Sequence, residues 1–185
     1  ADDLLMALKH WGRNPIEAVK DWFGVTPEDY QATALEALFA NQSSRVAMKS
    51  AHGVGKTAVL SWAGLIFLAT RPLSRVPATA PTANQLMDIL WPEFGKWMLR
   101  MPEELRSQFI TTATHIRHKK YPETWFATAR TSNKPDNMQG FHNDHVMVLV
   151  DEAPGVLQSI YEVIEGIMSN ADDHGQEARI LLTGN

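Results

Sequence analysis

A short glycine-containing segment carries the chemistry most easily read from this chain. Residues 50–57 are Ser50, Ala51, His52, Gly53, Val54, Gly55, Lys56 and Thr57. In a loop that joins a strand to a helix, such residues aim backbone N–H groups at the phosphates of a nucleotide, and the positive end of the helix adds its attraction. The segment therefore predicts a nucleoside triphosphate site.

Two side chains of this segment have separate predicted roles. Lys56 would reach the β- and γ-phosphates, and the Thr57 hydroxyl would bind Mg²⁺. Ser50 stands where a glycine is usual, so the backbone there must not need a positive φ. The alternative is an ordinary turn with a surface lysine, and the flanking elements decide between the two.

The flanking segments favour the phosphate-binding interpretation. Residues 45–49 have the composition of a short buried strand, and residues 57–69 are apolar on almost every face of a helix. Strand, loop and helix thus follow in the order that such a loop requires.

A second motif places two adjacent acids at the end of an apolar run. Residues 146–150 predict a strand buried on both faces, and Asp151 and Glu152 follow it. Ligands of open α/β sheets bind at the carboxyl ends of the strands, so the acids should lie beside the loop. Asp151 would hold Mg²⁺, directly or through water, and Glu152 would deprotonate an attacking water. The alternative is an acid pair that only caps the next segment.

Composition agrees with a single domain that has a sizeable core. The chain has 185 residues, 44% of them hydrophobic, and no cysteine, which excludes disulfides and cysteine-based metal sites. Its histidines lack ligand spacing, so no metal besides Mg²⁺ is expected. The apolar stretch 59–70 is too short to span a bilayer and no signal peptide opens the chain, so we expect a soluble intracellular protein.

The charge balance limits how the chain could contact nucleic acid. Its net charge of −4 is opposite to that of a dedicated nucleic-acid module, so DNA contacts would come from local patches. Residues 117–120, Arg-His-Lys-Lys, form the only dense basic run. A solvated hairpin tip explains that run without any function.

Helices and strands alternate along the rest of the chain. Thr26 and Asp29 resemble a capping box that starts a helix reaching about residue 40. Pro92 should bend or interrupt a helix over 84–99. The remaining predictions are helices at 2–10, 15–22 and 156–168, strands at 75–80 and 179–182, and a hairpin of 110–119 with 124–129. This alternation favours a mainly parallel sheet.

Together these motifs resemble the ATPase domain of large terminase subunits, the motors that package DNA into tailed-phage capsids. Residues 23–31 resemble the family's adenine-recognising segment, and residues 78–82 with Gln85 resemble the segment after its second strand. Gln139 and Gly140 resemble its glycine turn, and Thr183, Gly184 and Asn185 its coupling motif.

The resemblance implies a fold and a set of ligands. The fold would be α/β, a P-loop NTPase of the RecA-like type with an additional strand and a catalytic Glu, carrying a β-hairpin insertion and a helical N-terminal lead. Gln31 would pair with the adenine of ATP, with Tyr30 packed nearby, and Thr183, Gly184 and Asn185 would couple hydrolysis to movement. Residues 1–40 would form the adenine-recognising helical segment and residues 41–185 the ATPase core, with the family's nuclease domain absent from this chain.

The resemblance also implies partners. These are double-stranded DNA, the portal protein, the small terminase subunit and further copies of the chain in a ring, in the cytoplasm of a phage-infected host cell. No membrane contact is expected.

The chain departs from the family at the arginines. Many terminases have an arginine where His52 stands, and often another where Gln139 stands. An arginine finger is worth ~10³–10⁵ in rate, so another residue must supply the charge. Arg130 is the candidate, in cis or from a neighbouring subunit, with a plain surface charge as its alternative.

Two other functions compete with the packaging motor. The first domain of a superfamily 2 helicase shares the acid pair and the Ala-Pro-Thr segment, but it usually has Ser-Ala-Thr where this chain has Thr183-Gly-Asn. A nucleotide-dependent switch that does not hydrolyse would have no need of Glu152.

Overall fold

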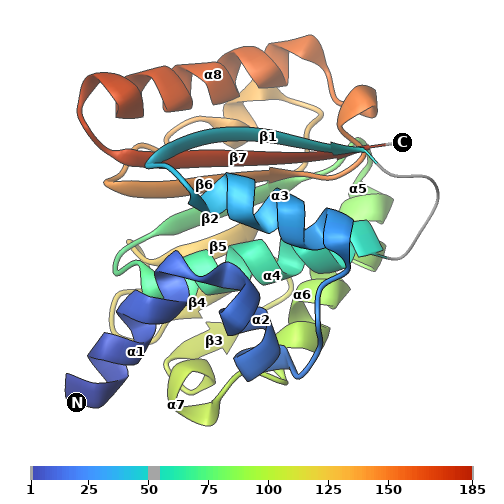
Figure 1. Ribbon diagram of the computed structural model, residues 1–185. Helices are drawn as coiled ribbons and strands as arrows, with labels where there is room; N and C mark the ends of the chain where they lie inside the picture. Colours follow the sequence, from blue (N-terminus) through green and yellow to red (C-terminus); the bar gives the residue numbers. More distant parts are fainter. Residues whose placement is uncertain (1, 50–54, 185) are drawn as a thin grey trace.

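The computed structural model describes residues 2–49 and 55–184. They form a seven-stranded sheet in the order β1-β7-β6-β2-β5-β4-β3 with helices on both faces (Figure 1). The strands are β1 (Ser43–Lys49), β2 (Arg75–Thr79), β3 (Phe109–Thr111), β4 (His115–His118), β5 (Phe126–Ala129), β6 (His145–Val150) and β7 (Glu177–Gly184). The α-helices are α1 (Asp2–Arg13), α2 (Pro15–Phe23), α3 (Asp29–Phe39), α4 (Gly55–Thr70), α5 (Ala83–Gln85), α6 (Trp91–Met98), α7 (Glu103–Arg106) and α8 (Gln158–Asp173).

Strand direction divides the sheet into two parts. β1, β7, β6, β2 and β5 run parallel, so their carboxyl ends meet at one edge. β5, β4 and β3 pair antiparallel. The fold is therefore the mainly parallel α/β sheet with a hairpin addition that the sequence predicts.

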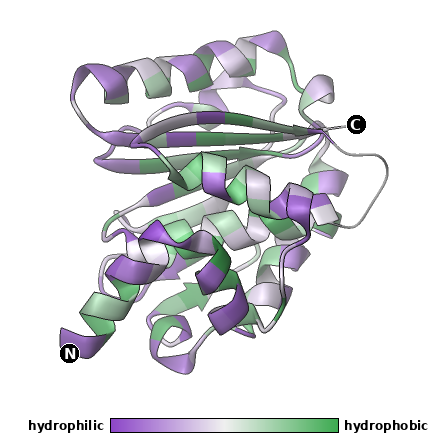
Figure 2. Cartoon of the chain, viewed as in Figure 1, coloured by the Kyte–Doolittle hydropathy of each residue, from purple (hydrophilic) through white to green (hydrophobic). Residues whose placement is uncertain are grey.

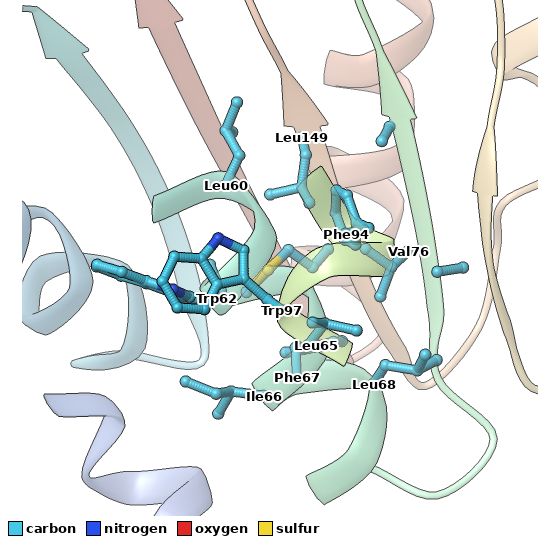
Figure 3. Packing of buried hydrophobic residues seen from close by; sticks show 14 of the residues in the cluster. Leu60, Trp62, Leu65, Ile66, Phe67, Leu68, Val76, Phe94, Trp97 and Leu149 are labelled. Carbon is cyan, nitrogen blue, oxygen red and sulfur yellow. The ribbon is translucent and has the colours of Figure 1, made fainter. Parts of the chain in front are cut away.

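Helix α4 is the centre of one layer of the core. Residues 58–69 of this helix are buried, as expected for a helix that is apolar on every face. Gly64 marks its closest approach to its neighbours, since a Cβ there would lie 2.8 Å from Phe94 of α6 and 2.9 Å from Leu149 of β6. Figure 3 shows Phe94 and Leu149 packed with the side chains of α4. This packing fixes the helix, and hence its first turn, against the sheet.

The opposite face of the sheet is covered by α8. Ile160, Ile164 and Ile167 of this helix are buried against Val148 and Ile180 of the sheet. In Figure 2 the helix carries both hydrophilic and hydrophobic residues, as expected when only one face is buried.

The N-terminal helices share the core of the α4 layer, with Val19, Phe23 and Leu35 buried in it. The predicted cap of α3 is wrong. Its N-cap is Glu28 rather than Thr26, because the Glu28 side chain accepts from the backbone of the third helical residue, Gln31, whose side chain in turn accepts from the Glu28 N–H. A capping box thus forms two residues later than Thr26 and Asp29 suggest.

The helix predicted over 84–99 is three pieces, with a π-helix (Leu86–Leu90) between α5 and α6. Pro92 has no N–H to donate to the preceding turn, so the prediction that it interrupts the helix is confirmed. The π form of the interruption was not predicted.

The prediction of one continuous strand over residues 110–119 is wrong. It is divided into β3 and β4, because the Thr112 hydroxyl accepts from the backbone N–H groups of Thr114 and His115 and so closes a turn. The predicted hairpin with residues 124–129 is present as β4 and β5.

A buried ionic network joins the elements at the amino edge of the sheet. Glu177 accepts from Arg71, Arg179 and His145, and Arg71 also donates to the Gly12 carbonyl of α1. Burial alone would raise the pKa of Glu177, but hydrogen bonds from His145, Arg71 and Arg179 hold that pKa well below its usual range. A hollow of about 850 Å³ lies beside this network, at the edge opposite to the predicted acids.

We expect Glu177→Gln to lower the free energy of unfolding at pH 7 by about 3–5 kcal/mol, because it leaves buried arginines unpaired. The folded pKa of Glu177 is below the unfolded value of 4.5, so its contribution is complete above that pH and is lost as the pH falls further. Urea unfolding at several pH values should show that the difference in unfolding free energy between wild type and Glu177→Gln becomes smaller below pH 4.5. The control is Glu162→Gln, at an exposed position on α8. A difference in unfolding free energy that does not change with pH would contradict the prediction.

Candidate functional site

The structure describes the end of the predicted phosphate loop. Gly55 opens α4, followed by the buried Lys56, which is 4% exposed, and by Thr57. The free backbone N–H groups of a helix's first turn point out of its N-terminus, the end suited to phosphate. The predictions for six further residues lie outside the described part of the chain: Ser50, Ala51, His52, Gly53, Val54 and Asn185.

Asp151 is the buried centre of the carboxyl edge. It follows β6, is 2% exposed, and its backbone N–H donates to the Thr79 carbonyl of β2. Its Oδ1 accepts from the Thr183 hydroxyl at 2.9 Å and from the Glu152 N–H at 3.0 Å. Its Oδ2 accepts from Gln85 Nε2 at 3.3 Å. A buried carboxylate needs such donors, and here the two side-chain donors come from segments far from Asp151 in the chain.

Thr183 connects the acid to the strand that leads into the loop. It is 1% exposed on β7, and the parallel register places it beside Met48 of β1. Gly184 follows beside Lys49, and a Cβ on Gly184 would lie 2.9 Å from Pro154. The predicted coupling residues Thr183 and Gly184 thus lie between the predicted acids and the start of the loop.

Glu152 has a strained backbone. Its φ and ψ are both 49°, the left-handed region, which costs a non-glycine residue on the order of 1 kcal/mol. The 3-10 turn after it (Ala153–Gly155) is held by the Tyr161 hydroxyl, which donates to the Ala153 carbonyl. A Cβ on Gly155 would lie 2.8 Å from Pro81, so the turn also packs closely against the segment that follows β2. Strain of this kind concentrates at functional positions.

Gln31 and Tyr30 lie beside the start of α4. Gln31 is 5% exposed, its Nε2 donates to the Gly55 carbonyl at 3.0 Å, and its Oε1 accepts from the Glu28 N–H at 2.9 Å. A Cβ on Gly55 would overlap the Tyr30 hydroxyl. Burial and the nearby Glu28 carboxylate raise the pKa of the Tyr30 hydroxyl. Both residues therefore contact Gly55, the end of the predicted loop. To pair with a nucleotide base, the Gln31 carboxamide would have to give up its present hydrogen bonds.

Arg130 directly follows β5, at the same edge as Asp151 but with β2 between their strands. Its guanidinium carbon lies 5.5 Å from the centre of the Phe141 ring, and its backbone N–H donates to the Ala78 carbonyl. Within residues 2–49 and 55–184, its buried Nε has no hydrogen-bond partner. Gln139 is exposed after a short 3-10 helix (Pro135–Met138).

The donor set suits Mg²⁺ bound together with a nucleotide. Mg²⁺ is usually held by one or two carboxylates, waters and substrate phosphates rather than by a full protein cage. Asp151 supplies a carboxylate whose Oδ2 keeps acceptor capacity, and Thr57 supplies a hydroxyl in the first turn of α4. Among the described residues, no group of three His, Cys, Asp or Glu side chains is placed to hold a metal ion.

Sequence reasoning did not predict the bond from Gln85 to Asp151. Gln85 was part of a family-like segment, but the two residues are far apart in the chain. The Thr82 hydroxyl, which accepts the Gln85 N–H and caps α5, was the local signal that Gln85 lies in an ordered turn.

Comparison with known proteins finds a sequence relative and several similar solved structures. No family model matches the chain. Over 174 residues, 90% of the chain, it is 29% identical to a protein of Enterobacteria phage P7 named "Probable terminase, large subunit", and it spans 34% of that protein's length.

Two of these structures are the large terminase ATPase domain of Thermus phage P74-26 and an arginine-to-alanine variant of it. At 20% identity each covers 92% of this chain, with TM-scores of 0.62 and 0.67, and this chain covers 70% and 69% of theirs. The chain is thus a homologue of a phage protein named as a large terminase subunit, and it has the fold of the large terminase ATPase domain.

Proposed function

We propose that this chain is the ATPase domain of a large terminase subunit, which hydrolyses ATP to drive DNA into a viral procapsid. The observation that carries the proposal is the buried Asp151, held by Thr183 at the edge of the sheet where α4 begins. The similarity to the phage P7 protein and to the phage P74-26 domain supports it. Neither similarity favours a helicase or a switch that does not hydrolyse.

Each site residue has a role in this proposal. The N-terminus of α4 and Lys56 bind the phosphates, and Thr57 and Asp151 hold Mg²⁺ with them. Mg²⁺, when bound, neutralises charge on the β- and γ-phosphates. Residues Ser50, Ala51, His52, Gly53, Val54 and Gly55 complete the loop.

Glu152 is the proposed base. It takes a proton from a water whose oxygen attacks the γ-phosphorus, while the bond from that phosphorus to the β–γ bridging oxygen breaks and leaves ADP. Its backbone is left-handed and directly follows Asp151, and in this proposal the two neighbouring carboxylates have different tasks. In this proposal, the coupling of ATP hydrolysis to movement runs through Thr183, Gly184 and Asn185.

The proposal extends to partners and organisation. Double-stranded DNA, the portal protein and the small terminase subunit are the partners, and the active form is a ring of copies in the host cytoplasm. Residues 1–40 act as the adenine-recognising lead and residues 41–185 as the ATPase core. No described helix is long and apolar enough to cross a membrane.

Removing the carboxylate charge of Glu152 tests the base. We expect Glu152→Gln to keep ATP affinity and to lower the rate of hydrolysis ~10²–10⁴-fold, because the water loses its proton acceptor. Lys56→Ala should instead weaken ATP binding. Fluorescent-nucleotide titration and phosphate release measure the two effects, with Glu162→Gln as the matched control. Equal hydrolysis in wild type and Glu152→Gln would refute the base.

The adenine assignment of Gln31 predicts a change in base preference. Gln31→Ala should lower affinity for ATP more than for GTP, since it removes the carboxamide proposed to read adenine. The control is Glu28→Ala, which removes the other side chain of the same capping box and should cost about 1 kcal/mol of stability without changing base preference. If both variants shift ATP and GTP binding alike, Gln31 does not read the base.

The finger assignment of Arg130 predicts a loss of rate without a loss of affinity. Arg130→Ala should lower the hydrolysis rate ~10³-fold or more. If a neighbouring copy donates the arginine, the wild-type rate per molecule rises with protein concentration. Arg117→Ala is the matched control, since Arg117 also lies over a ring, 5.4 Å from the centre of Phe126. A similar rate in all three proteins would exclude Arg130.

A further inference from the structure

Gln85 contacts the proposed metal ligand but has no role in the scheme above. Its Nε2 donates to Oδ2 of Asp151, and the two atoms are 3.3 Å apart. Gln85 itself is the last residue of α5, the short helix that follows β2. Asp151 is buried, whereas Gln85 is partly exposed at the surface of the same edge. Gln85 is therefore the outer neighbour of an otherwise enclosed carboxylate.

The backbone around Gln85 is fixed on both sides. The Thr82 hydroxyl accepts the Gln85 N–H at 3.1 Å, and the π-helix that follows buries Leu86 and Leu90 completely. A π-turn inside a helix is rare and occurs frequently at functional sites. Here the π-helix begins directly after Gln85, so the Gln85 side chain extends from an ordered helical backbone rather than from a loop.

The two oxygens of Asp151 are held differently. Oδ1 accepts from the Thr183 hydroxyl and the Glu152 N–H, whereas Oδ2 accepts from Gln85. Gln85 thus contacts the oxygen with the greater remaining acceptor capacity, the one that a cation or its water would use. The bond is long, and the carboxamide is neutral, so Gln85 adds no positive charge beside the proposed cation.

We propose that Gln85 is a positioning residue that sets how tightly the nucleotide site holds its divalent cation. It orients Oδ2 of Asp151 before the cation arrives, and a lysine in its place would neutralise the carboxylate instead. Partners that orient a metal ligand typically change metal affinity ~10–100-fold when they are removed. The inference rests on the proposed function, since it needs a nucleotide-bound cation at Asp151.

The test measures cation affinity rather than turnover. Free Mn²⁺, followed by its EPR signal, is titrated with the chain and a non-hydrolysable ATP analogue. We expect Gln85→Met, which keeps length but loses the donor, to bind Mn²⁺ at least about tenfold more weakly than wild type. Affinity for the analogue without a cation should not change. Asn84→Ala, at an exposed position of the same helix, is the control, and thermal unfolding verifies the fold of each variant.

The outcomes separate the two proposals. Equal Mn²⁺ affinity in wild type and Gln85→Met overturns the role of Gln85 and leaves the proposed function intact. A wild-type chain that binds the analogue but retains no Mn²⁺ with it overturns the metal site, and the role of Gln85 with it. Gln85→Lys is the second variant: a folded lysine variant with wild-type Mn²⁺ affinity also overturns the inference.

Discussion

The need to compensate one buried carboxylate organises the carboxyl edge of this sheet. Asp151 is almost fully enclosed, and an ionised group in that position is stable only with donors around it. Its donors come from β7, from the turn after β6 and from the segment after β2. Three separate segments must therefore reach their places before the acid can be accommodated. The same contacts make the edge a single unit, since a displacement of any donor changes the environment of the acid.

The rest of the fold keeps that edge in place. Helix α4 is buried on every face and packs at Gly64 against β6, so the end of the helix that begins at Gly55 has a fixed position relative to the acid strand. At the opposite edge, the Glu177 network joins β7, the segment after α4 and helix α1. The sheet thus has a polar cluster at each end and an apolar interior between them.

A structural feature of this chain can be predicted from the sequence when its signal lies in consecutive residues. The apolar run before Asp151 and the helix after the loop are visible in consecutive residues, and both are present as predicted. The cap predicted at Thr26 is wrong because the helix begins two residues later, where Glu28 and Gln31 form the capping box. The single strand predicted over 110–119 is wrong because one threonine hydroxyl closes a turn within it. The contact of Gln85 with Asp151 has no local signature, because only the packing of the whole sheet brings the two together. Likewise, Gln31 stands in a recognisable segment, but its bond to Gly55 depends on where α3 packs.

The order of the strands also has a consequence for the newly made chain. β1 leads into the phosphate loop, yet the strand beside it is β7, so Ser43 pairs with Ala178 near the far end of the described residues. During synthesis, β1 emerges early, but its hydrogen bonds to β7 can form only after almost all of the described residues have been made. A ribosome-bound chain that stops before β7 would therefore lack both the partner of β1 and the threonine that supports Asp151. The proposed nucleotide site should therefore form late and in one step, because the strand before its loop and its buried acid both depend on β7.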